Sequence, residues 1–469
     1  MDEYSLALKI DVATVVACIV LLVRFGGLCF SHPGTAYILF HLHTVTIRLA
    51  ALVNGASSLY SNWRGFYDPV RPDELARAAL YCDFAFMAVT AAWIFVGASP
   101  KASDRPPATT VKLEPKILLP ILALLLLAGI VGLRIAARIP GMEVYDGLGT
   151  SSESAAISYI LILPTSFGLA VLAHIYYYGF RWYTNLLLTA YLVLMAIQGG
   201  LRFRVIVGIL LAATIWVDRQ GRRWPSFAIV GVLAAVGLLF FPMKSIGTMI
   251  QEGRSVSDVS TMVSESLNDT LEGSAADHFF LDEFASALTL LDVQGKKYYG
   301  EIYLPMLTLP IPRAWWPDKP KLAPFLFDIS SGSRPMAQSG MITTYLGESY
   351  ANFGIVGIFL VPLLLAVGLA WFRRRAYLAP YDSVKRFSYV LLSVNFIQIF
   401  RGGLQSIVVF TFVNMMPLMI VIFAHLAVSR FRKSAQPRLS LVGLQARPMD
   451  NGLARLATGP LSDRPQGDS

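Results

Sequence analysis

Positively charged side chains recur in the short polar segments that separate long apolar stretches of the sequence. Arg313 and Lys319 lie in "IPRAWWPDKP", Arg202 and Arg204 in "QGGLRFR", and Arg401 in "FRGGLQS". Guanidinium groups bind phosphate oxygens through paired hydrogen bonds and stay charged at any relevant pH. The pattern predicts a convergent anion site, for which a diphosphate held in the bilayer by a lipid tail fits best. The alternative is that each arginine reaches separately to phospholipid headgroups.

Three acidic side chains are candidates for a general base. Glu348, in "TTYLGESYANFGIVG", comes just before an apolar stretch, where partial burial would raise the basicity of its carboxylate. It could equally cap the N-terminus of the helix that follows. Asp282 and Glu283 are weaker candidates, because adjacent residues on a helix point about 100° apart and cannot face each other as an acid/base pair.

The same polar segments carry aromatic and neutral groups. Trp315 and Trp316 could stack on the apolar face of a sugar or anchor the chain at the bilayer interface. Prolines restrain the backbone on either side of Arg313 and Lys319, and His278 could contact a phosphate. No Walker glycine loop, paired-aspartate motif or His/Asp metal cluster accompanies the cations. We therefore expect no cofactor, no metal ion and no nucleic-acid partner.

The composition identifies the elements that must position these groups. Of 469 residues, 55% are hydrophobic and only 15% are charged, and the mean hydropathy is +0.56, which is too apolar for soluble domains of this length. A helix needs about 20 apolar residues to cross the roughly 30 Å hydrocarbon layer. We expect an all-α polytopic integral membrane protein with about eleven transmembrane helices. The expected spans are 12–25, 34–54, 76–98, 116–137, 156–178, 182–199, 203–217, 225–246, 352–372, 386–400 and 408–428.

Basic residues beside these spans predict their orientation. Segments 218–224, 372–386 and 430–433 are dense in Lys and Arg, which places them in the cytoplasm. The C-terminus is then cytoplasmic and the N-terminus lies outside. No cleavable signal peptide is expected, because the first apolar run follows an acidic start.

With this orientation the sequence divides into four parts. These are N-terminal spans over 1–246, one large extracytoplasmic loop over 247–345, C-terminal spans over 346–430, and a disordered cytoplasmic tail over 431–469. Within the loop, Phe280, Phe284 and Leu288 recur every four residues. This spacing predicts amphipathic helices that lie over the membrane face.

A few polar and small residues stand out inside the expected spans. His41, His43 and Arg48 fall in the second span and indicate a polar interior, with Arg48 facing a cavity. Gly354 and Gly357 in "ANFGIVG" predict close helix packing.

Two of these motifs together resemble a known signature. "IPRAWWPDKP", followed after a spacer by "TTYLGESYANFGIVG", resembles the pattern of the bacterial Wzy-type oligosaccharide repeat-unit polymerases. The "QGGLRFR" segment is similar to a Gly-x-Arg helix start in that family, and the resemblance covers roughly residues 195 to 410. The matching positions are Pro312, Arg313, Lys319, Pro320, Gly347, Glu348, Tyr350, Asn352, Phe353, Gly354 and Gly357.

The resemblance implies a GT-C-like, multi-pass glycosyltransferase of the bacterial cytoplasmic (inner) membrane. Such a polymerase transfers a growing glycan from undecaprenyl diphosphate onto a lipid-linked oligosaccharide repeat unit, for O-antigen, capsule or exopolysaccharide. The implied partners are that lipid-linked oligosaccharide, the lipid bilayer and a chain-length-regulating membrane protein.

The residues can be given roles in this reaction. Negative charge builds on the departing diphosphate, so preorganised cations stabilise the transition state, and no metal is required. We assign this role to Arg313, Arg202 and Arg204. The supporting and substrate-binding residues are Arg401, Lys319, Tyr350, Asn352, Trp315, Trp316 and His278. Two alternatives stay open: an O-antigen-ligase-like transferase with the same lipid donor, and a non-enzymatic flippase for lipid-linked oligosaccharides.

Overall fold

A computed structural model describes most of the helical core of the chain. The described ranges are 2–56, 70–96, 166–197, 202–236, 280–308, 344–378 and 384–408, together with single positions at 124, 127, 128, 130, 131, 261, 264, 311, 315, 316, 318, 416 and 419. The first of the two units into which the chain divides, Met1–Phe423, contains all of the described residues. All contacts discussed below lie within the first unit.

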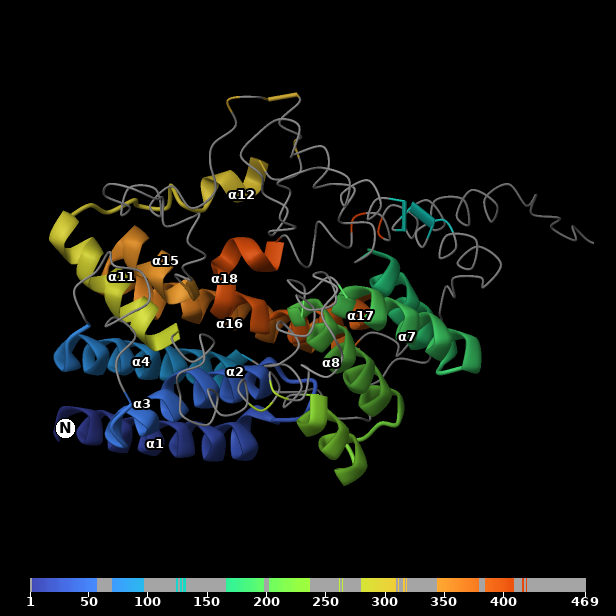
Figure 1. Ribbon diagram of the computed structural model, residues 1–469, viewed down its shortest axis with the longest axis horizontal. Helices are drawn as coiled ribbons and strands as arrows, with labels where there is room; N and C mark the ends of the chain where they lie inside the picture. Colours follow the sequence, from blue (N-terminus) through green and yellow to red (C-terminus); the bar gives the residue numbers. More distant parts are fainter. Residues whose placement is uncertain are drawn as a thin grey trace, which may run out of the picture. The chain divides into compact units, whose positions relative to one another are not determined.

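Every regular element in the described ranges is helical, and no strand occurs in them (Figure 1). The labelled helices are α1 (Asp2–Leu21), η1 (Leu22–Gly26), α2 (Pro33–His41), η2 (Leu42–Thr46), α3 (Ile47–Val53), α4 (Pro72–Val96), α7 (Trp182–Ile197), α8 (Arg202–Arg219), α11 (Phe280–Gln294), α12 (Leu304–Thr308), α15 (Thr344–Phe353), α16 (Ile355–Leu378), α17 (Val384–Asn395) and α18 (Ile397–Ile407). Residues 166–178 and Phe227–Val236 are helical as well. The expected all-α class is thus confirmed for this part of the chain.

Four helical stretches are long and apolar enough to cross a membrane. They are Glu3–Gly26, Pro33–Val53, Pro72–Val96 and Ile355–Leu378, which correspond to the first, second, third and ninth expected spans. The protein is therefore an α-helical membrane protein. The remaining expected spans fall wholly or partly outside the described residues, or in helices that are shorter or more charged, so their number stays a prediction.

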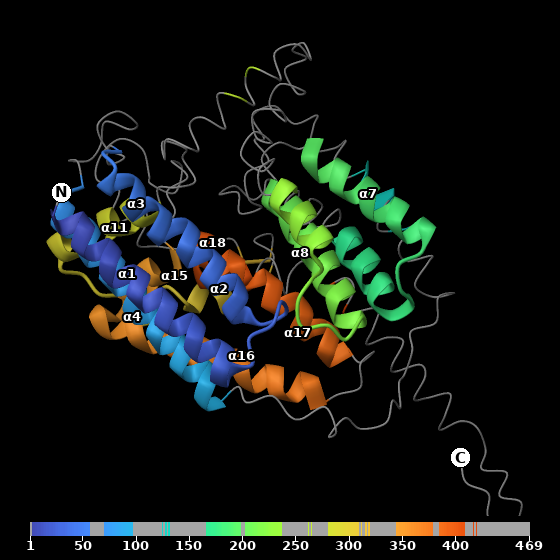
Figure 2. The ribbon, with the colours of Figure 1, turned by 90° about the horizontal axis from the view of Figure 1, so that it is seen from below.

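The spanning helices pack into one core. Helix α4 lies between α1 and α16, as Figures 1 and 2 both show. Aromatic side chains join this layer to the later helices: the Tyr37 ring stacks on Phe86 of α4 with 4.9 Å between centroids and meets Phe400 of α18 edge-on at 4.6 Å. The core thus links the N-terminal spans directly to the segment that carries Arg401.

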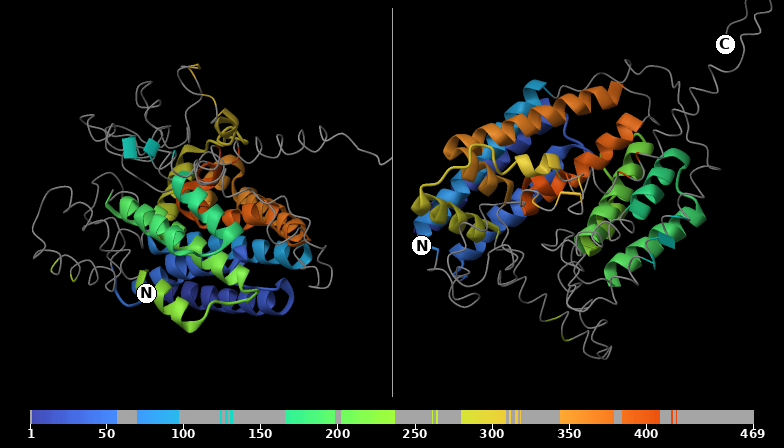
Figure 3. Two further views of the ribbon diagram at one scale, coloured as in Figure 1. Left: turned by 90° about the vertical axis from the view of Figure 1, so that its right-hand side faces the viewer. Right: turned by 90° about the horizontal axis from the view of Figure 1, so that it is seen from above.

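The basic segments meet at one end of this bundle. Arg386 of α17 donates to both carboxylate oxygens of Asp218 at the end of α8, at 3.2 and 2.7 Å. Arg373, near the end of α16, donates to the carbonyl oxygens of Gly26 and Gly27 at 3.1 and 2.9 Å. The Lys- and Arg-rich segments 218–224 and 372–386, which are both predicted to be cytoplasmic, are therefore neighbours in the fold. Figure 3 shows α7 and α8, coloured green, side by side in this region.

Helix α11 differs from the amphipathic surface helix that we expected. Every residue from Phe280 to Leu288 is buried, on all sides of the helix, because α11 packs against both α4 and α15. The Asp282 carboxylate on its polar face is hydrogen-bonded to a side chain of another helix instead of to water. Arg48 of α3 donates to Asp282 through Nε and Nη2 at 2.8 and 2.9 Å, and neither side chain is exposed.

This ion pair confirms the polar interior predicted for the second span and corrects the surroundings predicted for Arg48. The arginine is fully enclosed by protein and does not face a cavity. It also accounts for Asp282, which forms a buried ion pair in the structure. Glu283 is buried as well.

Candidate functional site

Helix α15 ends at Phe353 because the backbone turns at Gly354, before the spanning helix α16 begins at Ile355. Gly354 has φ +62°, a left-handed conformation that glycine adopts without strain, and its amide donates to the Tyr350 carbonyl oxygen at 2.8 Å. A Cβ on Gly357 would lie 2.0 Å from the carbonyl oxygen of Ser349. Close packing is thus confirmed at Gly357, whereas Gly354 makes the turn.

Glu348 lies in the middle of α15 and its carboxylate contacts the backbone of α18. The side chain is almost fully buried, and one carboxylate oxygen, Oε2, accepts a hydrogen bond from the Leu404 amide at 2.8 Å. Gly403 has φ +73°, and a Cβ there would lie 1.9 Å from the other oxygen, Oε1. The carboxylate therefore contacts Gly403 and Leu404, two and three residues after Arg401 in the sequence. Two of the motifs singled out in the sequence, "TTYLGESYANFGIVG" and "FRGGLQS", meet here.

The burial of Glu348 changes its acidity. Because the surrounding protein disfavours the charged form, burial raises the pKa of Glu348 from 4.5 to about 8, and the Leu404 amide opposes this only in part. Helix α15 lies just before the span α16, so this carboxyl group is outside the spanning stretch. Near neutral pH the group holds a proton, and once deprotonated it is a stronger base than an ordinary carboxylate. Its position within α15 also shows that the carboxylate does not cap the N-terminus of α16.

Asn352 joins the site to the segment before α12. Its Oδ1 accepts from the Gly300 amide at 2.8 Å, and its Nδ2 donates to the Glu348 carbonyl oxygen at 3.0 Å. Backbone amides of Tyr298 and Tyr299 donate to the carbonyl oxygens of Ala351 and Asn352, both at 3.0 Å. Asn352 therefore positions residues 298–300 on α15, and a direct contact with substrate stays a prediction.

Tyr303 is a member of this cluster that the sequence reasoning did not single out. Its hydroxyl oxygen is buried and makes no hydrogen bond within the described part of the chain. Burial raises the pKa of Tyr303 to about 12, while the neighbouring Ser349 side chain lowers it in part and the Glu348 carboxylate raises it further. The sequence marks Tyr303 only through the tyrosine-rich run "YYGEIY", residues 298–303, and nothing in that run distinguishes Tyr303 from a tyrosine that anchors the chain at the bilayer interface.

Tyr350 faces a different neighbour. Its hydroxyl donates to Asp292 of α11, whose other carboxylate oxygen accepts from Arg77 at 2.8 Å. The Lys297 ammonium lies 4.2 Å from the centre of the Tyr350 ring. A polar pocket of about 230 Å³ adjoins this group. It is lined by Arg71, Asp73, Glu74, Arg77, Thr289, Asp292 and Val293.

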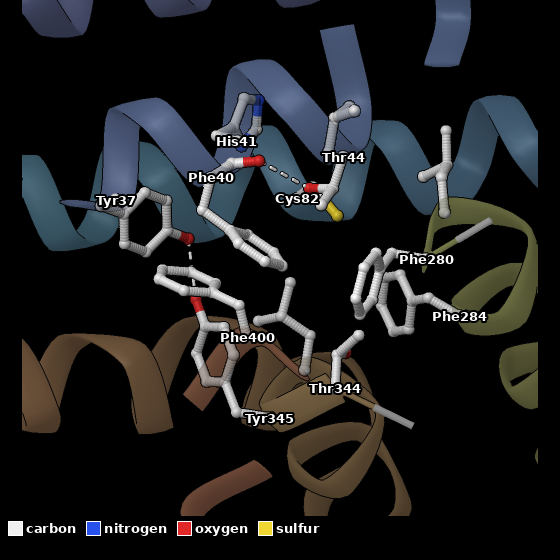
Figure 4. A pocket seen from close by; sticks show the side chains of 13 residues that line it. Tyr37, Phe40, His41, Thr44, Cys82, Phe280, Phe284, Thr344, Tyr345 and Phe400 are labelled. Atoms are coloured by element: carbon white, nitrogen blue, oxygen red, sulfur yellow. Dashed lines mark hydrogen bonds between the residues drawn. The ribbon is translucent and has the colours of Figure 1, made fainter. Parts of the chain in front are cut away.

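An apolar crevice separates α15 from the N-terminal spans. Figure 4 shows Phe280, Phe284 and Phe400 facing this space, and the Tyr37 and Tyr345 hydroxyl groups closing one side through a 2.7 Å hydrogen bond. Its volume of about 30 Å³ leaves room for roughly two water molecules. In this conformation it is too small to hold a prenyl chain.

For some of the predicted cations the structure describes the backbone and not the side chain, and the others lie outside the described residues. Arg202 and Arg204 open α8, and Arg401 lies in α18. The Asp218–Arg386 ion pair joins the C-terminal end of α8 to the N-terminal end of α17. Arg202 is at the other end of α8, and Arg401 is in α18, which follows α17. Both helical paths run away from the basic end, but their convergence on one anion stays a prediction.

The other predicted contacts are scattered between described and undescribed positions. Arg313, Lys319 and His278 lie outside the described residues. Trp315 and Trp316 are described, with 82% and 40% of their surfaces exposed. Their exposure fits either a sugar contact or an interfacial anchor.

Comparison of the chain with protein-family models, with curated proteins and with solved structures gives no match. The function is therefore argued from the residues and contacts above.

Proposed function

We propose that the protein is a membrane glycosyltransferase of the Wzy polymerase type. It transfers a growing glycan from undecaprenyl diphosphate onto a lipid-linked oligosaccharide repeat unit at the outer face of the bacterial cytoplasmic membrane. One observation carries the proposal: the buried Glu348 carboxylate of α15 contacts the backbone of α18 just after Arg401. A carboxyl group on α15 and the arginine-bearing helix α18, distant in sequence, are thus in contact.

The two groups suit the two halves of glycosyl transfer. Negative charge develops on the departing diphosphate, which Arg401, together with Arg202, Arg204 and Arg313, would stabilise in the transition state. The acceptor hydroxyl loses its proton as the new bond forms, and the fraction of Glu348 that is deprotonated near neutral pH, with a pKa of about 8, would accept that proton as a stronger base than an ordinary carboxylate. No step in this scheme requires a metal ion.

Reconstitution tests the proposal. Purified protein in liposomes, supplied with a synthetic lipid-diphosphate oligosaccharide, is expected to produce a ladder of longer lipid-linked chains on a glycan gel. Arg401→Ala is expected to lower the elongation rate by roughly a hundredfold, the usual effect of losing one group that stabilises transition-state charge. Arg401→Lys should recover only part of it, because lysine lacks the planar two-point geometry.

A matched control comes from the opposite end of α16. Arg374 is exposed and lies far from Glu348 along the helix, so Arg374→Ala should elongate at the wild-type rate. Failure of the wild-type protein to lengthen the lipid-linked donor would refute the proposal. Equal rates for Arg401→Ala and the control would remove Arg401 from the mechanism.

A further inference from the structure

A buried cluster of ionisable side chains lies in the N-terminal spans, apart from the Glu348 site. Asp11 of α1, His41 of α2 and Asp83 of α4 have only 0%, 3% and 1% of their surfaces exposed. The His41 Nε2 atom lies 2.7 Å from Asp11 Oδ1 and 3.4 Å from Asp83 Oδ1. One potential ligand atom from each residue lies within 4.8 Å of the other two. Three different membrane helices therefore direct ligand-type atoms to one point.

The charges of this cluster do not balance. When both carboxylates are ionised, two negative charges face one imidazole, so one negative charge is left over even if His41 is protonated. Burying an uncompensated charge in a membrane helix is costly, and Arg48, on the same span as His41, is paired with Asp282. Asp83 Oδ1 is buried without a hydrogen bond from any described residue. Asp83 Oδ1 is therefore a free acceptor atom in a cluster whose excess negative charge a bound cation would cancel.

We propose that Asp11, His41 and Asp83 bind one divalent transition-metal ion between α1, α2 and α4. One imidazole and two carboxylates form a ligand set suited to Zn²⁺ or Mn²⁺, and a divalent ion cancels both carboxylate charges. Bonds of 2.0–2.2 Å to such an ion put tetrahedral ligand atoms roughly 3.3 Å apart. The 3.4 Å separation of His41 and Asp83 already fits this value, and the Asp11 contact opens slightly when the ion replaces the shared proton.

The surroundings also suit a metal site. Thr46 Oγ1 donates to Asp11 Oδ2 at 2.6 Å, which leaves Oδ1 directed at His41 and fixes the orientation of the carboxylate. His41 and the neighbouring Cys82 also line the apolar crevice of Figure 4. The bound ion fastens three spans together and takes no part in glycosyl transfer. The inference is independent of the proposed function.

Metal analysis of the full-length protein in detergent tests the site. The protein is stripped with a chelator, dialysed against Zn²⁺ and analysed by mass spectrometry for metal content. We expect one tightly held zinc per chain in the wild type and less than a tenth of that in Asp83→Asn and His41→Gln. Thr46→Val, which removes only the orienting hydrogen bond, should weaken binding by roughly ten- to a hundredfold. His174→Gln alters a buried histidine elsewhere and should keep the metal.

A spectroscopic measurement keeps the test decisive if a variant fails to fold. Co²⁺ bound to the wild-type protein in place of Zn²⁺ should show the intense visible absorption of a low-coordinate site, and equimolar Zn²⁺ should abolish it. The assignment would be overturned if the wild-type protein retained no zinc after dialysis or showed only the spectrum of hydrated Co²⁺. The excess negative charge of the cluster would then be cancelled by protons. Zinc retained equally by wild type and Asp83→Asn would overturn it as well.

Discussion

The contact between Gly403 and Glu348 makes a specific prediction for Gly403→Ala. The backbone at Gly403 has φ +73°, and an added Cβ would lie 1.9 Å from Glu348 Oε1. A non-glycine residue in a left-handed conformation costs about 1–2 kcal/mol, and forcing an extra methyl group into a packed site costs about 1–3 kcal/mol more. We therefore expect Gly403→Ala to destabilise the protein by about 2–5 kcal/mol.

Gly221→Ala separates the two contributions. Gly221 has a similar φ of +65° and no atom within 4 Å of where its Cβ would be, so its substitution should cost only the backbone strain. Melting curves followed by tryptophan fluorescence in detergent should show a clearly larger drop in melting temperature for Gly403→Ala than for Gly221→Ala. Equal drops would refute the contact.

A double variant tests whether Glu348 is the group in conflict. In Gly403→Ala with Glu348→Ala the carboxylate is gone and the added methyl group has space. The loss of stability in the double variant should therefore be smaller than the sum of the two single losses, by a coupling energy of roughly 1–3 kcal/mol. Additive effects would mean that Gly403 and Glu348 do not touch.

The spans that the sequence predicted best are those whose signal is local. Length and hydropathy alone identify α1, α4 and α16, because a continuous apolar run specifies a membrane helix without reference to its neighbours. Helix α11 could not be placed in this way. Its Phe280, Phe284 and Leu288 spacing indicates one apolar face, but the burial of its polar face depends on Arg48, which lies in another span and more than two hundred positions away.

The candidate site follows the same rule. Glu348 could be chosen from its own motif and its place before an apolar stretch, and its burial, though deeper than the partial burial expected, agrees with the direction of the reasoning. Its contact with Gly403 and Leu404 could not be predicted, because no periodicity connects α15 to α18. The cluster of Asp11, His41 and Asp83 was missed for a related reason: the three residues lie in separate apolar runs, His41 is predicted only as part of a polar second span, and only the packing brings them together.

Two further substitutions test the buried charges. Arg48→Met leaves the Asp282 carboxylate without its partner in a fully buried position and should destabilise the protein by about 3–5 kcal/mol, whereas the pair Arg48→Met with Asp282→Leu should recover most of this loss. A double variant less stable than Arg48→Met alone would contradict that expectation when both are melted in detergent. Glu348 predicts a dependence on pH, because its pKa is about 8 in the folded protein against an ordinary value of 4.5. Between these values the folded protein holds a proton that the unfolded chain has released, so stability falls as the pH rises from about 5 to 8, by up to roughly 1.4 kcal/mol per pH unit. Glu348→Gln keeps the shape of the protonated side chain and cannot release the proton, so its melting temperature should fall less over this range. Parallel profiles for wild type and Glu348→Gln would show that the Glu348 carboxyl group is not held protonated by burial.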